Sequence, residues 1–297
     1  MYKELAIIAP TASGKTALSI ELANKIDAVI LSLDSLSVYK EIDIASAKPT
    51  IKERGEIKHF GIDCIYPNEK FDVVEFIQEY KKAKDYAKNN GKSLIIVGGT
   101  GFYLKSMIEG LSVAPILDED MKKIVKEKMR NPLDVYSMLD NVDHTFMKKI
   151  SKNDNYRIEK ALEIYTKTNL TPTEYFLQNR PQPIIKDIKI FEIITDTQIL
   201  RDRIKLRTKQ MIKDGIIDEV IALEQKYTRL PNAMSSIGIV ETLDYLDGKI
   251  SKKELEELIF IHTAQLAKRQ RTFNRSQFNN VIKGELKDLE NIILKEI

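Results

Sequence analysis

The sequence predicts an α/β fold, a parallel sheet covered by helices, with an all-α domain inserted into it. Three short apolar runs in the first third, at 4–8, 28–33 and 93–97, alternate with helical patterns. Short apolar strands that alternate with helices are typical of a parallel sheet buried on both faces. A further apolar run at 189–194 predicts another strand of the same sheet.

The helices are predicted from periodicity and from their start and stop signals. In the first third we expect them at 14–25, 72–89 and 101–109. The second can begin at Asp72 as its N-cap and end at Asn89-Asn90-Gly91. After the strand at 189–194, helices are predicted at 198–213, 215–227, 236–246, 251–275 and, as a short element, at the C-terminus.

The middle of the chain has a different character. From about 117 to 180 strand patterns vanish. Helical patterns dominate there, at 118–130, 143–151 and 154–167, and three prolines mark the exit, Pro172, Pro181 and Pro183. A chain of 297 residues is long enough for a core with a smaller domain inserted in it. We therefore expect a helical insertion at 115–183 and a core made of 1–114 and 184–297.

The first functional motif is a loop of small residues between a predicted strand and a predicted helix. It consists of Ala9, Pro10, Thr11, Ala12, Ser13, Gly14, Lys15 and Thr16. This order is the setting of a phosphate-binding loop, in which backbone N–H groups and Lys15 hold the anion and Thr16 can hold Mg²⁺. We expect a di- or triphosphate to bind here, on a P-loop NTPase-like sheet. Ala9 replaces the usual first glycine, and it fits if its φ is negative.

Two further motifs follow predicted strands. Asp34 ends the second strand, and Gly98-Gly99-Thr100-Gly101 follows the third. Because ligands lie at the carboxyl ends of parallel strands, both motifs should converge with the phosphate loop. Asp34 can ligate magnesium, take a proton from a substrate, or cap the next segment. Thr100 can donate or accept a hydrogen bond. Segment 93–101 lacks the acid with which a P-loop ATPase normally holds magnesium.

Basic residues are concentrated in two stretches of the C-terminal part. In the first, Arg203 and Arg207 share one helix face, where a bound anion would relieve their repulsion. The second stretch is Lys268-Arg269-Gln270-Arg271 with Arg275, interleaved with Phe273 and Phe278. Such a mixture suits a nucleic-acid backbone and its bases, although a solvated helix end has the same composition.

The composition of the chain argues against an internal disulfide, a zinc site and a membrane span. The net charge of +3 is too small to define a partner. Cys64 is the only cysteine, which excludes an internal disulfide and fits a reducing compartment. Three histidines far apart offer no zinc-site spacing. No run approaches the ~20 apolar residues of a membrane span, so we expect a cytoplasmic protein that binds no membrane.

Taken in order, these motifs resemble those of the tRNA dimethylallyltransferases over nearly the whole chain. The resemblance includes Pro10 to Thr16, Asp34-Ser35 with Val38-Tyr39, Asp43-Ile44 with Ala47-Lys48-Pro49, Gly98 to Gly101 with Tyr103-Leu104-Lys105, Asn153-Asp154 with Arg157-Ile158 and Ala161-Leu162-Glu163, Ser236-Ile237-Gly238, and Ala267-Lys268-Arg269-Gln270. The chain departs from the family pattern at Ala9, Ser37, Ala45-Ser46, Lys122, Lys160 and Phe273-Asn274.

The resemblance implies a reaction. Dimethylallyl diphosphate would place its diphosphate in the 9–16 loop and donate its five-carbon group to N6 of an adenosine in the anticodon arm of tRNA, the one next to the anticodon at position 37. Asp34 would accept a proton from N6, and Thr100 would hydrogen-bond near the reacting centre. Lys15, Thr16 with Mg²⁺, and Arg203 or Arg207 would stabilise the charge on the departing diphosphate.

The resemblance also implies contacts with tRNA. They fall on Asp34, Ser35, Leu36, Ser37, Thr100, Lys122, Arg157, Lys160, Lys268 and Arg269. We expect the helical insertion and the basic C-terminal helices to grip the anticodon arm, and the protein to be a monomer.

Two other functions compete with prenyl transfer. A small-molecule kinase of the same P-loop class would need an arginine-rich lid over its triphosphate, and the insertion has few arginines. A nucleic-acid-binding module that uses a nucleotide as a switch is the second alternative. Loss of turnover without loss of RNA affinity on substituting Asp34 would distinguish an enzyme from such a module.

Overall fold

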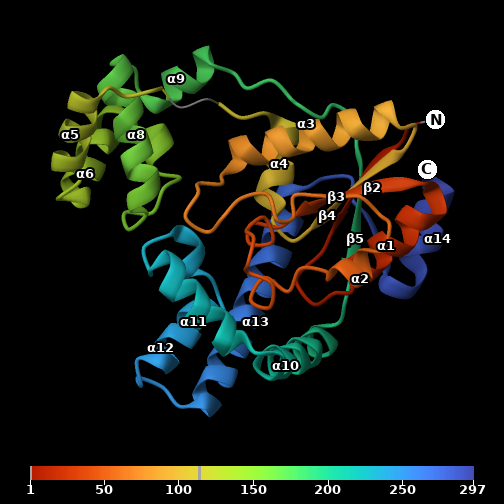
Figure 1. The fold of residues 1–297 in the computed structure, drawn as a ribbon. Coiled ribbons are helices and arrows are strands. Elements are labelled where there is room, and N and C mark those ends of the chain that lie inside the picture. Colours follow the sequence, from red (N-terminus) through yellow and green to blue (C-terminus); the bar gives the residue numbers. More distant parts are fainter. Residues whose placement is uncertain (1, 113–114) are drawn as a thin grey trace. The chain divides into compact units, whose positions relative to one another are not determined.

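The computed structural model describes residues 2–112 and 115–297 and divides the chain into two compact units (Figure 1). The first unit combines Met1–Ser106 with Ile185–Ile297, and the second is Met107–Ile184. The first holds a sheet with helices around it. In the second, the residues that the structure describes form helices and their connections.

The sheet has six strands, and every neighbouring pair in it is parallel. Its strands are β1 (Glu4–Ile8), β2 (Ala28–Leu33), β3 (His59–Phe60), β4 (Ser93–Gly98), β5 (Lys189–Ile194) and β6 (Ile282–Glu285). Their order is β3-β2-β4-β1-β5-β6. This arrangement confirms the predicted α/β fold class, and four of the strands coincide with the predicted apolar runs.

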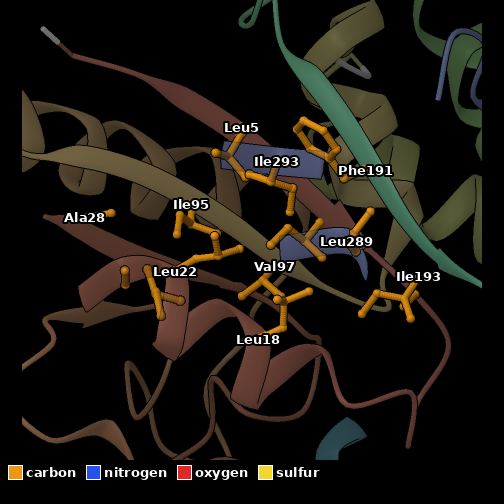
Figure 2. Packing of buried hydrophobic residues seen from close by; sticks show 14 residues of the cluster. Leu5, Leu18, Leu22, Ala28, Ile95, Val97, Phe191, Ile193, Leu289 and Ile293 are labelled. Carbon is orange, nitrogen blue, oxygen red and sulfur yellow. The ribbon is translucent and has the colours of Figure 1, made fainter. Parts of the chain in front are cut away.

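The sheet is buried on both faces, as its continuous apolar strands require. One face packs on α1 (Lys15–Ile26) and α14 (Leu286–Glu296) (Figure 2). The side chains in this cluster include Leu5, Ile95 and Phe191 from strands and Leu18, Leu22, Leu289 and Ile293 from the helices. Helix α3 (Val73–Asn89) packs against β2 and β4. Each fully buried aliphatic side chain stabilises the fold by about 1.5–3 kcal/mol.

The remaining helices of the first unit begin at polar caps or at glycines, except η1, which follows Pro231. They are α2 (Ile51–Arg54), α4 (Gly101–Glu109, which runs into the second unit), α10 (Thr197–Asp214), α11 (Ile216–Tyr227), the 3₁₀ turn η1 (Asn232–Ser235), α12 (Ile239–Leu246) and α13 (Lys252–Gln277). Asp72 caps α3 through a capping box with Glu75, as its position in the sequence predicts. The side chains of Asp196 and Ser251 likewise accept hydrogen bonds from the first backbone N–H groups of α10 and α13.

One prediction for this unit needs correction, and the sequence does not predict the one-turn helix α2 or two of the strands. The helix predicted at 236–246 begins only at Ile239, because Gly238 has φ 93° and cannot continue a helix. The strands β3 and β6 were not predicted. Each is short, and neither has the apolar run or alternation that identifies a strand.

The second unit has its own small core. Its helices are α5 (Glu119–Lys128), α6 (Pro132–Val142), α7 (His144–Met147), α8 (Asn155–Thr168) and α9 (Pro172–Gln178). Buried Leu139, Met147 and Leu162 pack together inside it. The helix predicted at 143–151 is a single turn, and α6 and α9 were not predicted. Pro172, taken to mark an exit, instead starts α9 at the one position where a missing N–H costs nothing.

No helix in the part of the chain that the structure describes is both long and apolar enough to span a membrane.

Candidate active site

The register of the sheet brings the three predicted loops to one edge. Ile8 of β1 pairs with Gly98 of β4, and Gly98 pairs with Leu33 of β2. Backbone hydrogen bonds extend this ladder beyond the strands, from Ala9 N to the Gly98 carbonyl (3.3 Å) and from Thr100 N to the Leu33 carbonyl (3.0 Å). The phosphate loop, Asp34 and Thr100 therefore start side by side, as the topology predicted.

The phosphate loop has the backbone shape that anion binding needs. Ala12 (φ 62°) and Gly14 (φ 93°) adopt the left-handed region, whereas Ala9 does not, so its side chain is tolerated. Gly14 is the N-cap of α1 and offers no side-chain cap, and the first turn of this fully described helix has no acidic residue. The first N–H groups of α1 are thus left to an anion, together with the positive end of its dipole.

Lys15 lies at the base of this loop. Its Nζ donates to the Pro10 carbonyl at 3.5 Å. Burial lowers the pKa of Lys15 to about 8, with Asp34 opposing that shift and Arg207 adding to it. A bound anion would supply the partner charge that favours the protonated form.

Both arginines of the first basic stretch reach the same loop from α10. Arg203 Nη1 donates to the Ser13 carbonyl (3.3 Å), and Arg207 Nη1 donates to Thr11 Oγ1 (3.2 Å). The second Arg207 nitrogen, Nη2, donates to the Ala47 carbonyl (3.1 Å). Burial lowers the pKa of Arg207, and Asp34 opposes this. Three positive charges thus gather on one loop, which favours an anionic ligand.

Asp34 has one of the three roles that the sequence left open, because it caps the segment that follows it. Its Oδ1 accepts from Leu36 N (2.8 Å) and Ser37 N (3.2 Å), so the carboxylate does cap the next segment. The two bonds also fix the carboxylate in one orientation at the sheet edge. The Ser37 side chain is buried and shares a hydrogen bond with Ser32 Oγ (3.1 Å), so it points into the fold.

Helix α13 joins the phosphate loop to the glycine-rich loop through Gln270. Gln270 Oε1 accepts from Thr11 N at 2.9 Å. A Cβ atom at Gly99 would lie 2.3 Å from Gln270 Nε2, and one at Gly98 would lie 2.1 Å from the Leu33 carbonyl oxygen. Gly98 is therefore required, because its neighbour is fixed backbone, whereas a Cβ at Gly99 would displace the end of the Gln270 side chain. In the sequence, Gln270 belongs to a basic run and to the last family motif, and neither indicates its contact with the loop.

A chamber of about 290 Å³ opens between these elements. Its lining includes Lys15, Asp34, Thr100 and Arg207, together with Ser35 and Leu36. Apolar side chains from α10, α13 and the segment before α12 also line it, namely Ile204, Met211, Ile237, Ile259 and Leu266, alongside hydroxyl-bearing residues such as Thr208, Ser236 and Thr263. A chamber whose lining combines cationic and apolar side chains suits an anion with a hydrocarbon group attached.

The other predicted RNA contacts lie on helices. In the second unit, Lys122 of α5 pairs with Glu119 (2.7 Å), and Lys160 of α8 pairs with Glu163 (2.7 Å). Arg157 of α8 pairs with Asp154 (3.4 Å). In the first unit, Lys268 and Arg269 are exposed on α13. Lys268 lines a groove of about 660 Å³ between α10 and α13, together with Arg201, Arg271 and Arg275.

Among the residues that the structure describes, no three His, Cys, Asp or Glu side chains are arranged to hold a metal ion. Thr16, at the start of α1, is exposed.

This sheet, its phosphate loop and the helical second unit define a P-loop-like α/β protein. Comparison with known proteins is more specific. The model of the IPP transferase family matches residues 37–277. The chain is 58% identical to the tRNA dimethylallyltransferase of Aliarcobacter butzleri, over 99% of this chain and 98% of that protein. It is 55% identical to the enzyme of the same name from Sulfurimonas denitrificans, over 99% of each.

Solved structures agree with this assignment. A tRNA isopentenylpyrophosphate transferase from Bacillus halodurans matches 100% of this chain and 97% of its own, with 28% identity and a TM-score of 0.73. A eukaryotic dimethylallyltransferase acting on tRNA matches 99% of this chain and 77% of its own, with 25% identity and a TM-score of 0.84. The chain belongs to the IPP transferase family, which confirms the resemblance of its motifs.

Proposed function

We propose that this protein transfers a dimethylallyl group from dimethylallyl diphosphate to N6 of the adenosine next to the anticodon of tRNA, and releases diphosphate. Its curated relatives are named for this activity. The observation that carries the proposal is the chamber, where a cationic phosphate loop, a carboxylate and apolar walls adjoin one another.

The donor would bind with its diphosphate in the 9–16 loop and its five-carbon group along the apolar walls. Cleavage of the allylic C–O bond builds negative charge on the departing diphosphate. Lys15, Arg203 and Arg207 lie where that charge would develop. Removing one such prearranged donor typically costs about 3–4 kcal/mol of transition-state stabilisation. The apolar walls would also keep water from the allylic cation.

A magnesium ion fits this arrangement only as a partner of the diphosphate. Magnesium commonly keeps several waters and binds through one or two protein oxygens plus substrate phosphates. The Thr16 hydroxyl, exposed at the start of α1, is the protein oxygen that would hold it. When bound, the ion would neutralise charge on the leaving group.

The acceptor adenine would enter beside Asp34 and Thr100. N6 of adenine is a poor nucleophile because its lone pair is delocalised into the ring, so removal of its proton assists attack. Asp34, oriented by its two backbone hydrogen bonds, would take that proton. Thr100, Ser35 and Leu36 line the same chamber and would contact the base. An enzyme that modifies a stacked base must extrude it into such a pocket.

The anticodon arm would be held by the remaining basic residues, Lys122, Arg157 and Lys160 of the second unit and Lys268 and Arg269 of α13. Ser37 would contribute to RNA binding only through its backbone, because its side chain is buried. We further propose that the protein works as a monomer in the cytoplasm, where its RNA substrate is found.

Nucleoside mass analysis tests the proposed function directly. The purified chain is incubated with an anticodon stem–loop RNA, dimethylallyl diphosphate and Mg²⁺. We expect one adenosine to gain a single five-carbon unit, and the same RNA with guanosine at that position to gain none. Incubation with labelled ATP and nucleoside monophosphates tests the kinase alternative. Phosphate transfer there, without prenylation of the RNA, would overturn the proposal.

A further inference from the structure

A carboxylate outside the chamber holds one of the segments that form it. Glu219, in the first turn of α11, accepts hydrogen bonds from three consecutive backbone N–H groups of that segment. Its Oε2 accepts from Asp43 (2.8 Å) and Ile44 (2.7 Å), and its Oε1 accepts from Ala45 (2.9 Å). Hydrogen bonds to an ionised carboxylate are about twice as strong as neutral ones. Glu219 thus anchors the start of segment 43–48.

The other end of the same segment meets Arg207. Ala47 has φ 48°, a left-handed conformation that is unfavourable for alanine and persists only where contacts enforce it. In this conformation its carbonyl accepts from Arg207 Nη2 at 3.1 Å. Next to it, buried Lys48 donates to the Tyr39 carbonyl (2.9 Å) and pairs with Asp43 (2.6 Å). The segment is therefore fixed at both ends.

Arg207 is held between this segment and the phosphate loop. One guanidinium nitrogen contacts Ala47, and the other contacts Thr11 in the loop. Glu219 and Arg207 come from α11 and α10, two helices that meet at Gly215. Glu219 is not among the residues that line the chamber or the adjoining cavities. It can therefore affect the geometry of a ligand site only through the segment that it anchors.

We propose that Glu219 is a positioning residue for the diphosphate site. Glu219 fixes segment 43–48, and the Ala47 carbonyl of this segment holds Arg207 in the orientation that meets the donor's diphosphate. The inference rests on the proposed function, since it takes the 9–16 loop as the diphosphate site. It adds a residue whose role depends on Arg207 and on no other group of that site.

The sign of one substitution separates positioning from simple charge. Glu219→Gln removes a negative charge near an anion site, which by electrostatics alone would strengthen anion binding. Positioning predicts the reverse. Whichever way the amide is turned, its NH₂ group faces backbone N–H donors, so the segment loses at least one anchor. We expect the dissociation constant of inorganic pyrophosphate, measured by titration calorimetry, to rise about tenfold.

The matched control is Asp218→Asn. Asp218 is exposed in the same turn of α11, so this variant removes the same charge and leaves the anchored segment intact. We expect its pyrophosphate affinity to equal that of the unsubstituted protein or to exceed it slightly. Equal losses in the two variants would overturn the proposal.

A double-mutant cycle tests the route through Arg207. In the Arg203→Ala background, Glu219→Gln should still weaken pyrophosphate binding about tenfold. In the Arg207→Ala background it should weaken binding less than twofold, because the group that it positions is gone. A tenfold loss in both backgrounds would show that Glu219 acts on the fold in general. Failure of the unsubstituted protein to bind pyrophosphate would instead contradict the diphosphate site itself.

Hydrogen exchange provides a readout that needs no ligand. The amides of Asp43, Ile44 and Ala45 should exchange at least tenfold faster in Glu219→Gln than in Asp218→Asn, with the core amides of β1 unchanged. Unchanged exchange at these three amides would overturn the anchoring step, even if a variant bound too weakly for calorimetry.

Discussion

The two sides of the candidate site are built in different ways. On the sheet side, the phosphate loop, Asp34 and Thr100 each follow a strand directly, and the ladder of hydrogen bonds sets their positions. On the helical side, Arg207 and Gln270 reach across from α10 and α13. The Gln270 contact with Thr11 joins residues 259 positions apart in the chain.

This difference suggests that the sheet side and the helical side have different roles in the site. The sheet side is rigid because its backbone is part of the core, so a change in one of its functional side chains alters the charge or the chemistry of the site and leaves its geometry intact. The helical side depends on long side chains that meet backbone carbonyls and amides. A change there should alter how tightly a ligand is held. The predictions below test this difference, beginning with the largest effect.

Asp34→Asn should abolish most turnover while leaving both ligands bound. The amide keeps an oxygen that can accept from Leu36 N and Ser37 N, so the turn after β2 survives. It cannot take a proton from N6. We expect kcat for prenyl transfer to fall by about 10²–10⁴, with less than a threefold change in pyrophosphate and RNA affinity.

Single-turnover rates and equilibrium titrations on the same preparation check this prediction. Asp34→Ala is a poorer variant, because it also removes the acceptor for two backbone N–H groups. A kcat within threefold of the unsubstituted value would show that Asp34 acts only as a cap, and would remove the strongest evidence for chemistry on the sheet side.

Lys15 gives the next largest effect, as a dependence on pH. Its pKa of about 8 in the free protein means that it loses its charge as pH rises through that value. Pyrophosphate binding must restore the proton, so affinity should fall by about tenfold per pH unit above pH 8. In Lys15→Arg the guanidinium stays charged, and the slope contributed by this residue should vanish. Identical slopes in the two proteins would contradict the prediction.

The stability of the free protein should respond to pH in the opposite direction. The pKa of Lys15 is lower in the folded state than the ordinary value of 10.5, so the unfolded chain binds more protons between about pH 8 and pH 10.5. The contribution of Lys15 to the free energy of unfolding therefore increases with pH across that window. Urea unfolding at several pH values, compared with Lys15→Arg, measures this difference.

The sheet side could be predicted from sequence, and the helical side only in part. An apolar strand followed by Asp34 or by Gly-Lys-Thr is a local signal, and parallel topology places the rest. Arg203 and Arg207 could be paired because they lie four residues apart on one helix. Glu219 left no such signal, since its partners are backbone N–H groups about 175 positions away. Because backbone N–H groups are present in nearly every residue, the residue types at 43–45 do not indicate that a carboxylate binds them.

The same reason explains the errors in the fold. Strand β6, at the sheet edge, needs no long apolar run, because it is half-covered. The sequence does not predict helix α9, because a proline such as Pro172 is typical of a helix stop and is equally suited to the first turn of a helix. For both β6 and α9 the local sequence is compatible with more than one structure, and packing against other parts of the chain decides between them.

Substitution of Lys268 should weaken RNA binding in a way that depends on salt. A plot of log K for RNA binding against log salt concentration has a negative slope. If the basic groove on α13 holds phosphates, each lost cation should reduce the magnitude of that slope by about 0.7 for a single-stranded loop. Lys268→Ala and Arg269→Ala should each show this change. Lys253→Ala, at the opposite end of the same helix, is the control and should show none. Equal slopes in all three variants would exclude α13 from the RNA interface.

The smallest expected effect concerns stability on the helical side. Asn274 of α13 is buried, and neither Oδ1 nor Nδ2 has a hydrogen-bond partner in the described part of the chain. Leucine has a similar shape and no polar atom, so Asn274→Leu should increase stability by about 1 kcal/mol, since an unsatisfied buried amide costs about 1–3 kcal/mol. The melting temperature should rise by about 2–4 °C.

The control for this substitution is Asn24→Leu on the exposed face of α1, which changes helix propensity alone and should shift the melting temperature by less than half as much. A loss of stability in Asn274→Leu would mean that the amide makes bonds that offset its burial, and that this part of the helical side is as well satisfied as the sheet. A gain would mean that α13 accepts a cost beside Gly101, where a Cβ atom would lie 2.9 Å from the amide oxygen. The packing of the helical side would then be less stable than that of the sheet side, as expected if the helical side must move to admit a base.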